Sequence, residues 1–195
     1  APNPVAGAGR TSKLEACSIL ARQVLVPLGY RTEVVVTARP RDGHSQSVRA
    51  VADGVELLVA WGGDGTVNEV ASAVAFSSST LAIVPAGSGN GLARDLGVPL
   101  DPAGALQVAG SGRDRRIDAG QLGDALFFNV AGIGLDGVIA ARLALPRARR
   151  GLVGYVQAVC LEWPRYRPRR YLLRGDGVEY EGPAWFVALA NSRQY

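Results

Sequence analysis

The stretch Trp61-Gly62-Gly63-Asp64-Gly65-Thr66, followed by Asn68 and Glu69, decides the fold predicted for this chain. An apolar run, residues 55–60, leads into the stretch and is predicted to be a strand. Apolar residues at helical spacing leave it, namely Val67, Val70, Ala71 and Val74. The glycines therefore lie at a turn from a strand to a helix, where the missing side chains let a ligand approach the backbone.

This turn has the features of a phosphate site. The N–H groups at the start of the following helix have no partner within the helix, and they suit an anion. The Asp64 carboxylate would repel a bare phosphate, so we expect it to act through Mg²⁺ or through a transferable proton. The alternative is a turn that merely connects two elements, although few such turns need three glycines in four positions.

A second glycine-rich turn, Gly87-Ser88-Gly89-Asn90-Gly91, follows the next predicted strand, residues 81–84. It places bare backbone before a helix predicted at 92–96. Alone this signal is weak, but together the two turns suggest two sides of one nucleotide site. The chain contains no G-x-x-x-x-G-K-[ST] motif and is therefore not a P-loop protein.

Up to about residue 110, predicted strands alternate with predicted helices, which indicates an α/β fold with a parallel sheet and helices on both faces. The strands are expected at 32–37, 55–60 and 81–84, and the helices at 12–25, 44–52, 66–74, 92–96 and 102–109. Ligands bind beyond the carboxyl ends of the strands in such sheets. The loops 3–9, 62–66 and 87–90 are predicted to lie at that edge.

From about Gly110 onward the pattern becomes β-rich, so we predict two domains, residues 1–110 and 111–195. A hairpin is expected at 116–121 and 125–131, helices at 135–145 and 152–163, and antiparallel strands at 171–173, 178–180 and 184–190. A sheet this small leaves an exposed edge. We therefore expect the natural domain to continue beyond Tyr195, or a second copy of the chain to cover the edge in a homodimer.

Composition sets broader limits. Apolar residues make up 48% of the chain, which allows a packed core, and the net charge is +4 with one lysine, Lys13. Cys17 and Cys160 are too few and too far apart for a disulfide framework or a zinc site. His44, the only histidine, stands alone, so no Ser-His-Asp or Cys-His arrangement is predicted. Without a signal peptide or an apolar run of about 20 residues, the expectation is a soluble cytoplasmic protein.

A basic region interleaved with aromatic residues follows in the second half. Its arginines are opposed by Glu162 alone, and they are Arg142, Arg147, Arg149, Arg150, Arg165, Arg167, Arg169 and Arg170. Trp163, Tyr166 and Tyr171 interleave with them. Such a region is a solvated face, a nucleic-acid patch or a contact for anionic lipid headgroups. Lipid is the favoured functional interpretation, and no nucleic-acid partner is expected.

The motifs together resemble the diacylglycerol kinase catalytic-domain family, which includes sphingosine, ceramide and bacterial lipid kinases. The resemblance rests on Asn3-Pro4-x-x-Gly7, Thr37, Gly43-His44, Gly62 to Glu69, Pro85 to Arg94, and Asn129-x-Ala131-Gly132-x-Gly134-x-Asp136. It implies an ATP-binding α/β domain related to those of phosphofructokinase and NAD kinase, followed by a β-sandwich domain that is incomplete here. It also implies a lipid kinase that uses ATP and Mg²⁺ and acts on a lipid substrate at a membrane surface.

The resemblance also assigns roles to residues. Those implied to contact ATP are Asn3, Gly7, Thr37, Gly62, Gly63, Gly65, Thr66, Glu69, Gly87, Ser88, Gly89 and Asn90. Asp64 would act at the phosphates, and Asp136 would face the lipid headgroup. From its position alone, Asp136 is equally well a helix N-cap. The metal ligands are not identified.

Two departures from the family pattern bear on function. Gly91 stands where bacterial diacylglycerol kinases usually carry Asp, and sphingosine kinases have a small residue there, so the acceptor is either diacylglycerol or a sphingoid-type lipid. The family's later Asp-Gly-Glu segment, thought to supply the catalytic base, has no match before Tyr195. The alternatives are a soluble-substrate kinase of the NAD kinase type and a non-catalytic module that binds nucleotide or lipid.

Overall fold

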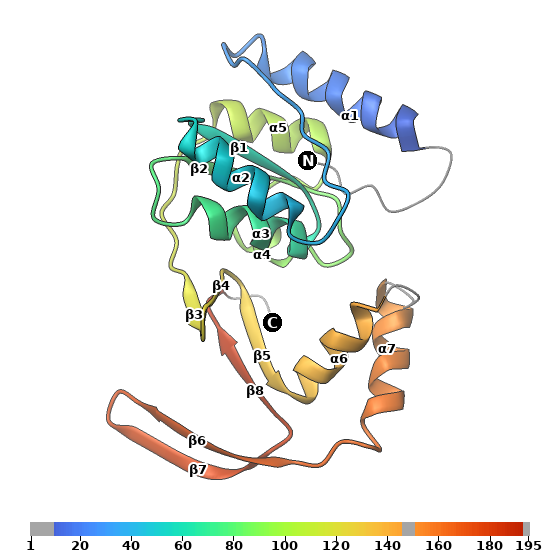
Figure 1. The fold of residues 1–195 in the computed structure, drawn as a ribbon, viewed down its shortest axis with the longest axis vertical. Coiled ribbons are helices and arrows are strands. Elements are labelled where there is room, and N and C mark those ends of the chain that lie inside the picture. The colour runs from blue at the N-terminus through green and yellow to red at the C-terminus, as the bar shows by residue number, and fades with distance from the viewer. Residues whose placement is uncertain (1–9, 146–150, 193–195) are drawn as a thin grey trace. The chain divides into compact units, whose positions relative to one another are not determined.

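A computed structural model describes residues 10–145 and 151–192 (Figure 1). The chain divides into two compact units, residues 1–129 with 191–195 and residues 130–190. The first contains parallel strands between helices and the second contains antiparallel strands, which confirms the predicted mixed α/β class. Within the described ranges, none of the helices combines the length and the apolar character needed to cross a membrane.

The first unit is built around two parallel strands. Its elements are α1 (Arg10–Leu25), α2 (Asp42–Ala52), β1 (Leu57–Gly62), α3 (Asp64–Val74), β2 (Thr80–Pro85), α4 (Gly91–Asp95), α5 (Pro102–Ser111), β3 (Gly120–Leu122) and β4 (Ala125–Phe127). β1 and β2 pair from Leu57 opposite Thr80 to Gly62 opposite Pro85. Both strands therefore end at the same edge, where the two glycine turns follow.

Alternation along β1 and β2 buries both faces of this sheet. Leu58 and Ala60 of β1 pack with Ile83 of β2 against α3 and α4. Trp61 and Val84 point to the opposite face and pack with residues of α1 and α5. Figure 1 shows the two strands between α5 and α3. Successive residues of a strand point to opposite faces of the sheet. One short apolar strand therefore packs against helices on both faces.

One predicted strand is wrong. Residues 32–37 contain three consecutive valines, but they form no strand in the structure. β-Branched residues favour extended backbone, yet a strand also needs a neighbouring ladder. Within the described residues, β1 pairs only with β2 in the parallel sheet. The predicted hairpin at 116–131 is also shorter than expected, because Val130–Gly134 forms a separate strand in the second unit.

Within the first unit, the β3–β4 hairpin packs against α3. The Asn68 side chain donates a hydrogen bond from Nδ2 to the Leu126 carbonyl at 3.3 Å, and Phe128 joins the core formed by β1 and α3. The predicted domain boundary at residue 110 stays a prediction about the natural protein.

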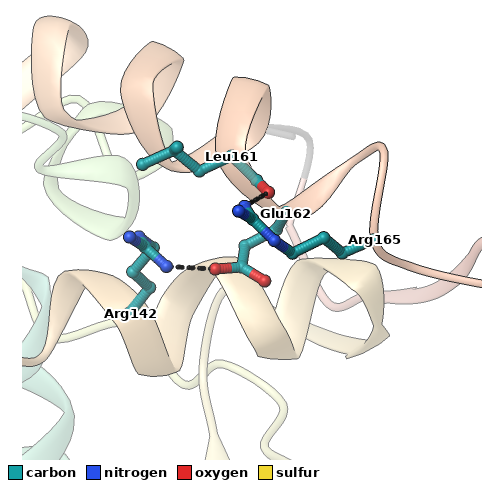
Figure 2. Close-up of polar contacts among 4 residues, drawn as sticks. All are labelled: Arg142, Leu161, Glu162 and Arg165. Carbon is teal, nitrogen blue, oxygen red and sulfur yellow. Dashed lines mark hydrogen bonds and ion pairs between the residues drawn. The ribbon is translucent and has the colours of Figure 1, made fainter.

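The second unit contains an antiparallel pair, a helical hairpin and a β-hairpin. Its elements are β5 (Val130–Gly134), α6 (Leu135–Leu143), α7 (Gly151–Glu162), β6 (Arg169–Gly175), β7 (Val178–Ala184) and β8 (Phe186–Ala190). β5 pairs with β8, and β6 pairs with β7. Leu135 and Ile139 of α6 pack on Ala158 of α7. Glu162 and Arg142 form an ion pair between the two helices, and Arg165 donates to the Leu161 carbonyl (Figure 2).

Leu106 of α5 is fully buried in the core beneath β1 and β2, whereas Val108 of the same helix is 45% exposed. Leu106→Ala is expected to lower the free energy of unfolding by about 2–5 kcal/mol, because it leaves a cavity. The matched change Val108→Ala is expected to cost less than about 0.5 kcal/mol. Urea titration monitored by circular dichroism measures both, and equal effects would contradict the assigned core.

Candidate functional site

The two glycine turns touch each other through their backbones. A Cβ atom placed on Gly87 would lie 2.6 Å from the Gly63 Cα, and one placed on Gly63 would lie 3.1 Å from the Gly87 Cα. The Ala86 N–H also donates to the Gly62 carbonyl at 2.9 Å, which extends the parallel ladder into the turns. Side chains at Gly63 or Gly87 would force the turns apart, so glycine is required by contact here.

Gly62 is required by a different neighbour. A Cβ atom on Gly62 would lie 2.6 Å from the Thr66 side chain, one turn into α3. The threonine therefore covers the backbone at the end of β1. Gly65 has no atom within 4 Å of the position of its absent Cβ. Packing thus explains Gly62 and Gly63, but it does not explain Gly65.

Asp64 begins α3 and reaches across to the second turn. Its Oδ2 accepts a hydrogen bond from the Asn90 N–H at 2.9 Å, and its Oδ1 accepts from the Gly91 N–H at 2.7 Å. These N–H groups open α4, and sequence reasoning expected such groups to hold a phosphate. The protein's own carboxylate occupies them instead. Each carboxylate oxygen keeps a further lone pair, so Asp64 is able to contact a cation as well.

Asn90 fixes the shape of the second turn. Its backbone has φ 54°, in the left-handed region that asparagine tolerates better than most residues. Its side chain accepts from the Gly87 N–H at 2.9 Å and donates to the Gly87 carbonyl at 2.8 Å. The Arg94 Nε donates to the Gly89 carbonyl at 3.0 Å. Ser88 and Gly89 are exposed at the tip of this braced turn.

Glu69 supports a third loop, which precedes α2. Its Oε1 accepts from the Arg41 N–H at 3.0 Å, and a Cβ on Gly43 would lie 2.7 Å from its Oε2. Asp42 accepts from two further backbone N–H groups, those of residues 38 and 39. Thr37 is buried just before this loop, and His44 is exposed in the first turn of α2.

Asp136 lies in the second unit, in the first turn of α6. The predicted alternative, a helix N-cap, is wrong because Gly134 holds that position without a side-chain hydrogen bond. The Asp136 carboxylate instead folds over Gly132, which has no room for a Cβ. Negative charge in a first helical turn interacts favourably with the helix dipole.

Aromatic side chains surround Gly134, whose φ is 91°. A Cβ there would lie 2.6 Å from the Tyr171 hydroxyl and 3.0 Å from the Tyr166 hydroxyl. The two hydroxyls are 3.5 Å apart, and their hydrogen bond is the main reason that the pKa of Tyr171 is raised above its ordinary value. Trp163 and Trp185 stack nearby, with ring centroids 4.6 Å apart.

The described residues contain no group of three or more His, Cys, Asp or Glu side chains placed to hold a metal ion. Asp42, Asp64 and Glu69 instead each accept hydrogen bonds from backbone N–H groups of the loops around the turns.

Residues 2–122 match the family model described as the diacylglycerol kinase catalytic domain. The chain belongs to this family. A "Probable lipid kinase YegS-like" protein of Klebsiella pneumoniae is 32% identical over 192 residues, which cover 96% of this chain and 63% of that protein. A diacylglycerol kinase of Staphylococcus aureus is 29% identical over 84% of this chain and 54% of its own length.

Solved structures of diacylglycerol kinase relatives have the same fold. A crystal structure of a diacylglycerol kinase from Bacillus anthracis has a TM-score of 0.68 and 27% identity, covering 98% of this chain and 62% of that one. A second crystal structure from the same organism gives a TM-score of 0.77 with 26% identity, covering 100% of this chain and 64% of that one. The chain thus spans a little over half to under two thirds of each of these relatives.

The structure brings together some, but not all, of the site residues predicted from the sequence. The glycine turns, Asp64 and Asn90 form one cluster at the ends of β1 and β2, and Glu69 anchors the adjoining loop. Asn3 and Gly7 lie outside the described residues, and Asp136 belongs to the other unit. Asp42, whose carboxylate holds the loop before α2, was not identified from the sequence. Its position directly before the Gly43-His44 pair was the one sequence feature that pointed to it.

Gly87→Ala is expected to destabilise the first unit by about 1–3 kcal/mol, because the new methyl group overlaps the Gly63 backbone. Gly65→Ala is the matched control. It has open space and lies in α3, so it should leave stability unchanged or raise it by about 0.5 kcal/mol. Urea unfolding compares the two, and an unperturbed Gly87→Ala protein would refute the contact between the turns.

The Tyr166–Tyr171 hydrogen bond is expected to make the stability of the second unit depend on pH in the alkaline range. Because the folded state raises the pKa of Tyr171, the stabilisation is fully present below the ordinary tyrosine pKa of about 10 and is lost as the pH rises through the raised value. Tyr166→Phe should move the Tyr171 titration back toward the ordinary value. Phenolate absorbance follows this, with Tyr180→Phe as the control that should leave the raised titration in place.

Proposed function

We propose that this protein is a lipid kinase that transfers the γ-phosphoryl group of ATP, with Mg²⁺, to a hydroxyl group of a lipid. The acceptor is diacylglycerol or a sphingoid-type lipid. The proposal rests on family membership and on one observation, the contact of Gly63 with Gly87, which holds two side-chain-free turns together at the ends of parallel strands. That edge is where nucleotides bind in open α/β sheets.

The turns fit a nucleotide's phosphates. Ser88 and Gly89 are exposed, and the turn that carries them is held by the side chains of Asn90, Asp64 and Arg94. A braced loop binds without the cost of ordering. Gly65 has open space at the start of α3, where a side chain would intrude on a ligand at the helix N-terminus. This explains the one glycine that packing leaves unexplained.

The carboxylates fit Mg²⁺ only in part. Proteins commonly hold Mg²⁺ with one or two carboxylates together with substrate phosphates and water. Asp64 is the carboxylate at the turns, and its oxygens retain lone pairs beside their two backbone hydrogen bonds. When bound, Mg²⁺ would neutralise phosphate charge; the protein's contribution is to position the groups in line.

The other predicted site residues are proposed to serve either the nucleotide site or the lipid site. Gly62, Gly63, Thr66, Glu69 and Gly87 shape the proposed nucleotide site through the contacts described above, and Thr37 is buried just before the loop that Glu69 holds. Asp136, at the start of α6, is proposed to face the lipid headgroup. A lipid acceptor places the reaction at a membrane surface, so the proposed location is cytoplasmic and peripheral to the membrane.

Transfer of labelled γ-phosphate tests the function. The protein is incubated with ATP, Mg²⁺ and mixed micelles that contain diacylglycerol or a sphingoid base, with NAD as a soluble acceptor. Label in one lipid class, lost on chelation of Mg²⁺, is the expected result. Label in NAD alone would favour a kinase of the NAD kinase type. ATP binding without transfer to any acceptor would favour a non-catalytic module.

Asp64→Asn separates the chemistry from the folding. The variant should lose phosphoryl transfer by about a hundredfold or more, because the charge at the phosphates is gone. Asp101→Asn is the matched control, since Asp101 accepts the Gly104 N–H at 2.7 Å and caps α5 away from the turns. Both should lose about 1 kcal/mol of stability. Retained transfer in folded Asp64→Asn would refute the proposed role.

A further inference from the structure

Helix α7 carries an apolar stripe that faces away from its partner helix. Val153, Val156, Cys160 and Trp163 follow one another at spacings of three or four residues, which places them on one side of the helix and its last turn. Val153 is 64% exposed, Val156 is 51% exposed and Trp163 is 50% exposed. Cys160 between them is also exposed. The stripe is therefore continuous along the helix.

The opposite side of α7 accounts for the packing of the helix. Gly154 and Ala158 are buried, and Ala158 belongs to the cluster with Leu135 and Ile139 of α6. α7 thus has two apolar sides, and the two valines of the second side stay exposed. A helix that is apolar on both sides indicates a second apolar neighbour.

Positive charge adjoins the end of this stripe. Arg165, Arg167 and Arg169 follow Trp163 within six residues, and all three are exposed. Glu162, the one acidic residue in this part of the chain, is already paired with Arg142 (Figure 2). Among the described residues, neither Arg167 nor Arg169 forms an ion pair. Their charge is therefore available to an external anion.

We infer that the α7 stripe and the following arginines form a surface that docks on an anionic lipid bilayer. Apolar side chains at the headgroup boundary, an indole ring, and arginines that reach anionic headgroups are the combination by which a helix lies in a membrane interface. The Trp163 ring stacks on Trp185 through one face, which holds it in place at the end of the stripe. This rests on the proposed function, in which the acceptor lipid lies in a membrane.

Nucleic acid is the other polyanion that exposed arginines attract. It would use the arginines but would gain nothing from Val153 and Val156, which are aliphatic and cannot stack with bases. A bilayer uses both parts of the surface. The exposed aliphatic stripe therefore favours lipid.

Sedimentation with vesicles tests the surface without ATP. The protein should bind vesicles of phosphatidylcholine with phosphatidylglycerol and should bind vesicles of phosphatidylcholine alone much more weakly. Val156→Asp should weaken binding about tenfold or more, because it removes an inserted side chain and adds a repelled charge. Arg167→Ala and Arg169→Ala should each weaken it about fivefold, and added salt should weaken binding by the unchanged protein.

Val178→Asp is the matched control. Val178 is 70% exposed in the same unit, at the turn of the β6–β7 hairpin and off the α7 stripe. It should leave vesicle binding unchanged. Equal losses in Val156→Asp and Val178→Asp would overturn the assignment to α7.

Quenching of tryptophan fluorescence tests the same surface in the unaltered protein, so the result does not depend on whether a variant folds. Brominated phosphatidylcholine, mixed with phosphatidylglycerol, should quench Trp163, whereas Trp61 is buried in the first unit. Absence of quenching, or tighter binding to single-stranded RNA that Val156→Asp does not affect, would overturn the proposal. Vesicle binding without phosphoryl transfer would defeat only the kinase function, and transfer in micelles without vesicle binding would defeat only the docking surface.

Discussion

The contact between Gly63 and Gly87 is the constraint on which the first unit depends. Parallel strands β1 and β2 end side by side, and the chain leaves each strand in the same direction. The two turns must therefore share a space that has room for backbone alone. The apolar clusters on both faces of β1 and β2 fix the positions of the strand ends. The positions of the turns are therefore set by apolar packing some residues away.

Polar side chains then lock the turns by bonding to backbone. Asp64 bonds to the start of α4, Asn90 bonds across its own turn, and Glu69 bonds to the loop before α2. Each of these residues stands in a motif that looks catalytic in sequence. Their first task in the structure is to satisfy N–H groups that helix starts and turns leave without partners. These hydrogen bonds hold the turns without a bound ligand.

Much of this architecture could be predicted because it is local. Hydrophobic spacing predicted α1 and α3, a helix was also predicted where α2 lies, and short apolar runs predicted β1 and β2. The strand predicted at residues 32–37 failed because valine-rich sequence specifies an extended chain but not a partner for it. The residues of the candidate site were likewise visible, whereas the partner of each was not. Nothing in the sequence says that Asp64 reaches Gly91, since that contact joins residues 27 positions apart.

The pairing of β5 with β8 has a further consequence. Gly134 lies opposite Phe186, so the described elements between them, α6, α7 and the β6–β7 hairpin, belong to a segment that leaves and returns at one point. The neighbouring residues Asn129 and Asn191 are also joined, by a backbone hydrogen bond of 2.8 Å. A segment with adjacent ends is one that evolution is able to lengthen, trim or exchange without moving the elements that flank it. Proteins that share the first unit are in this way able to differ in the helices between β5 and β8, and therefore in the surface that these helices present.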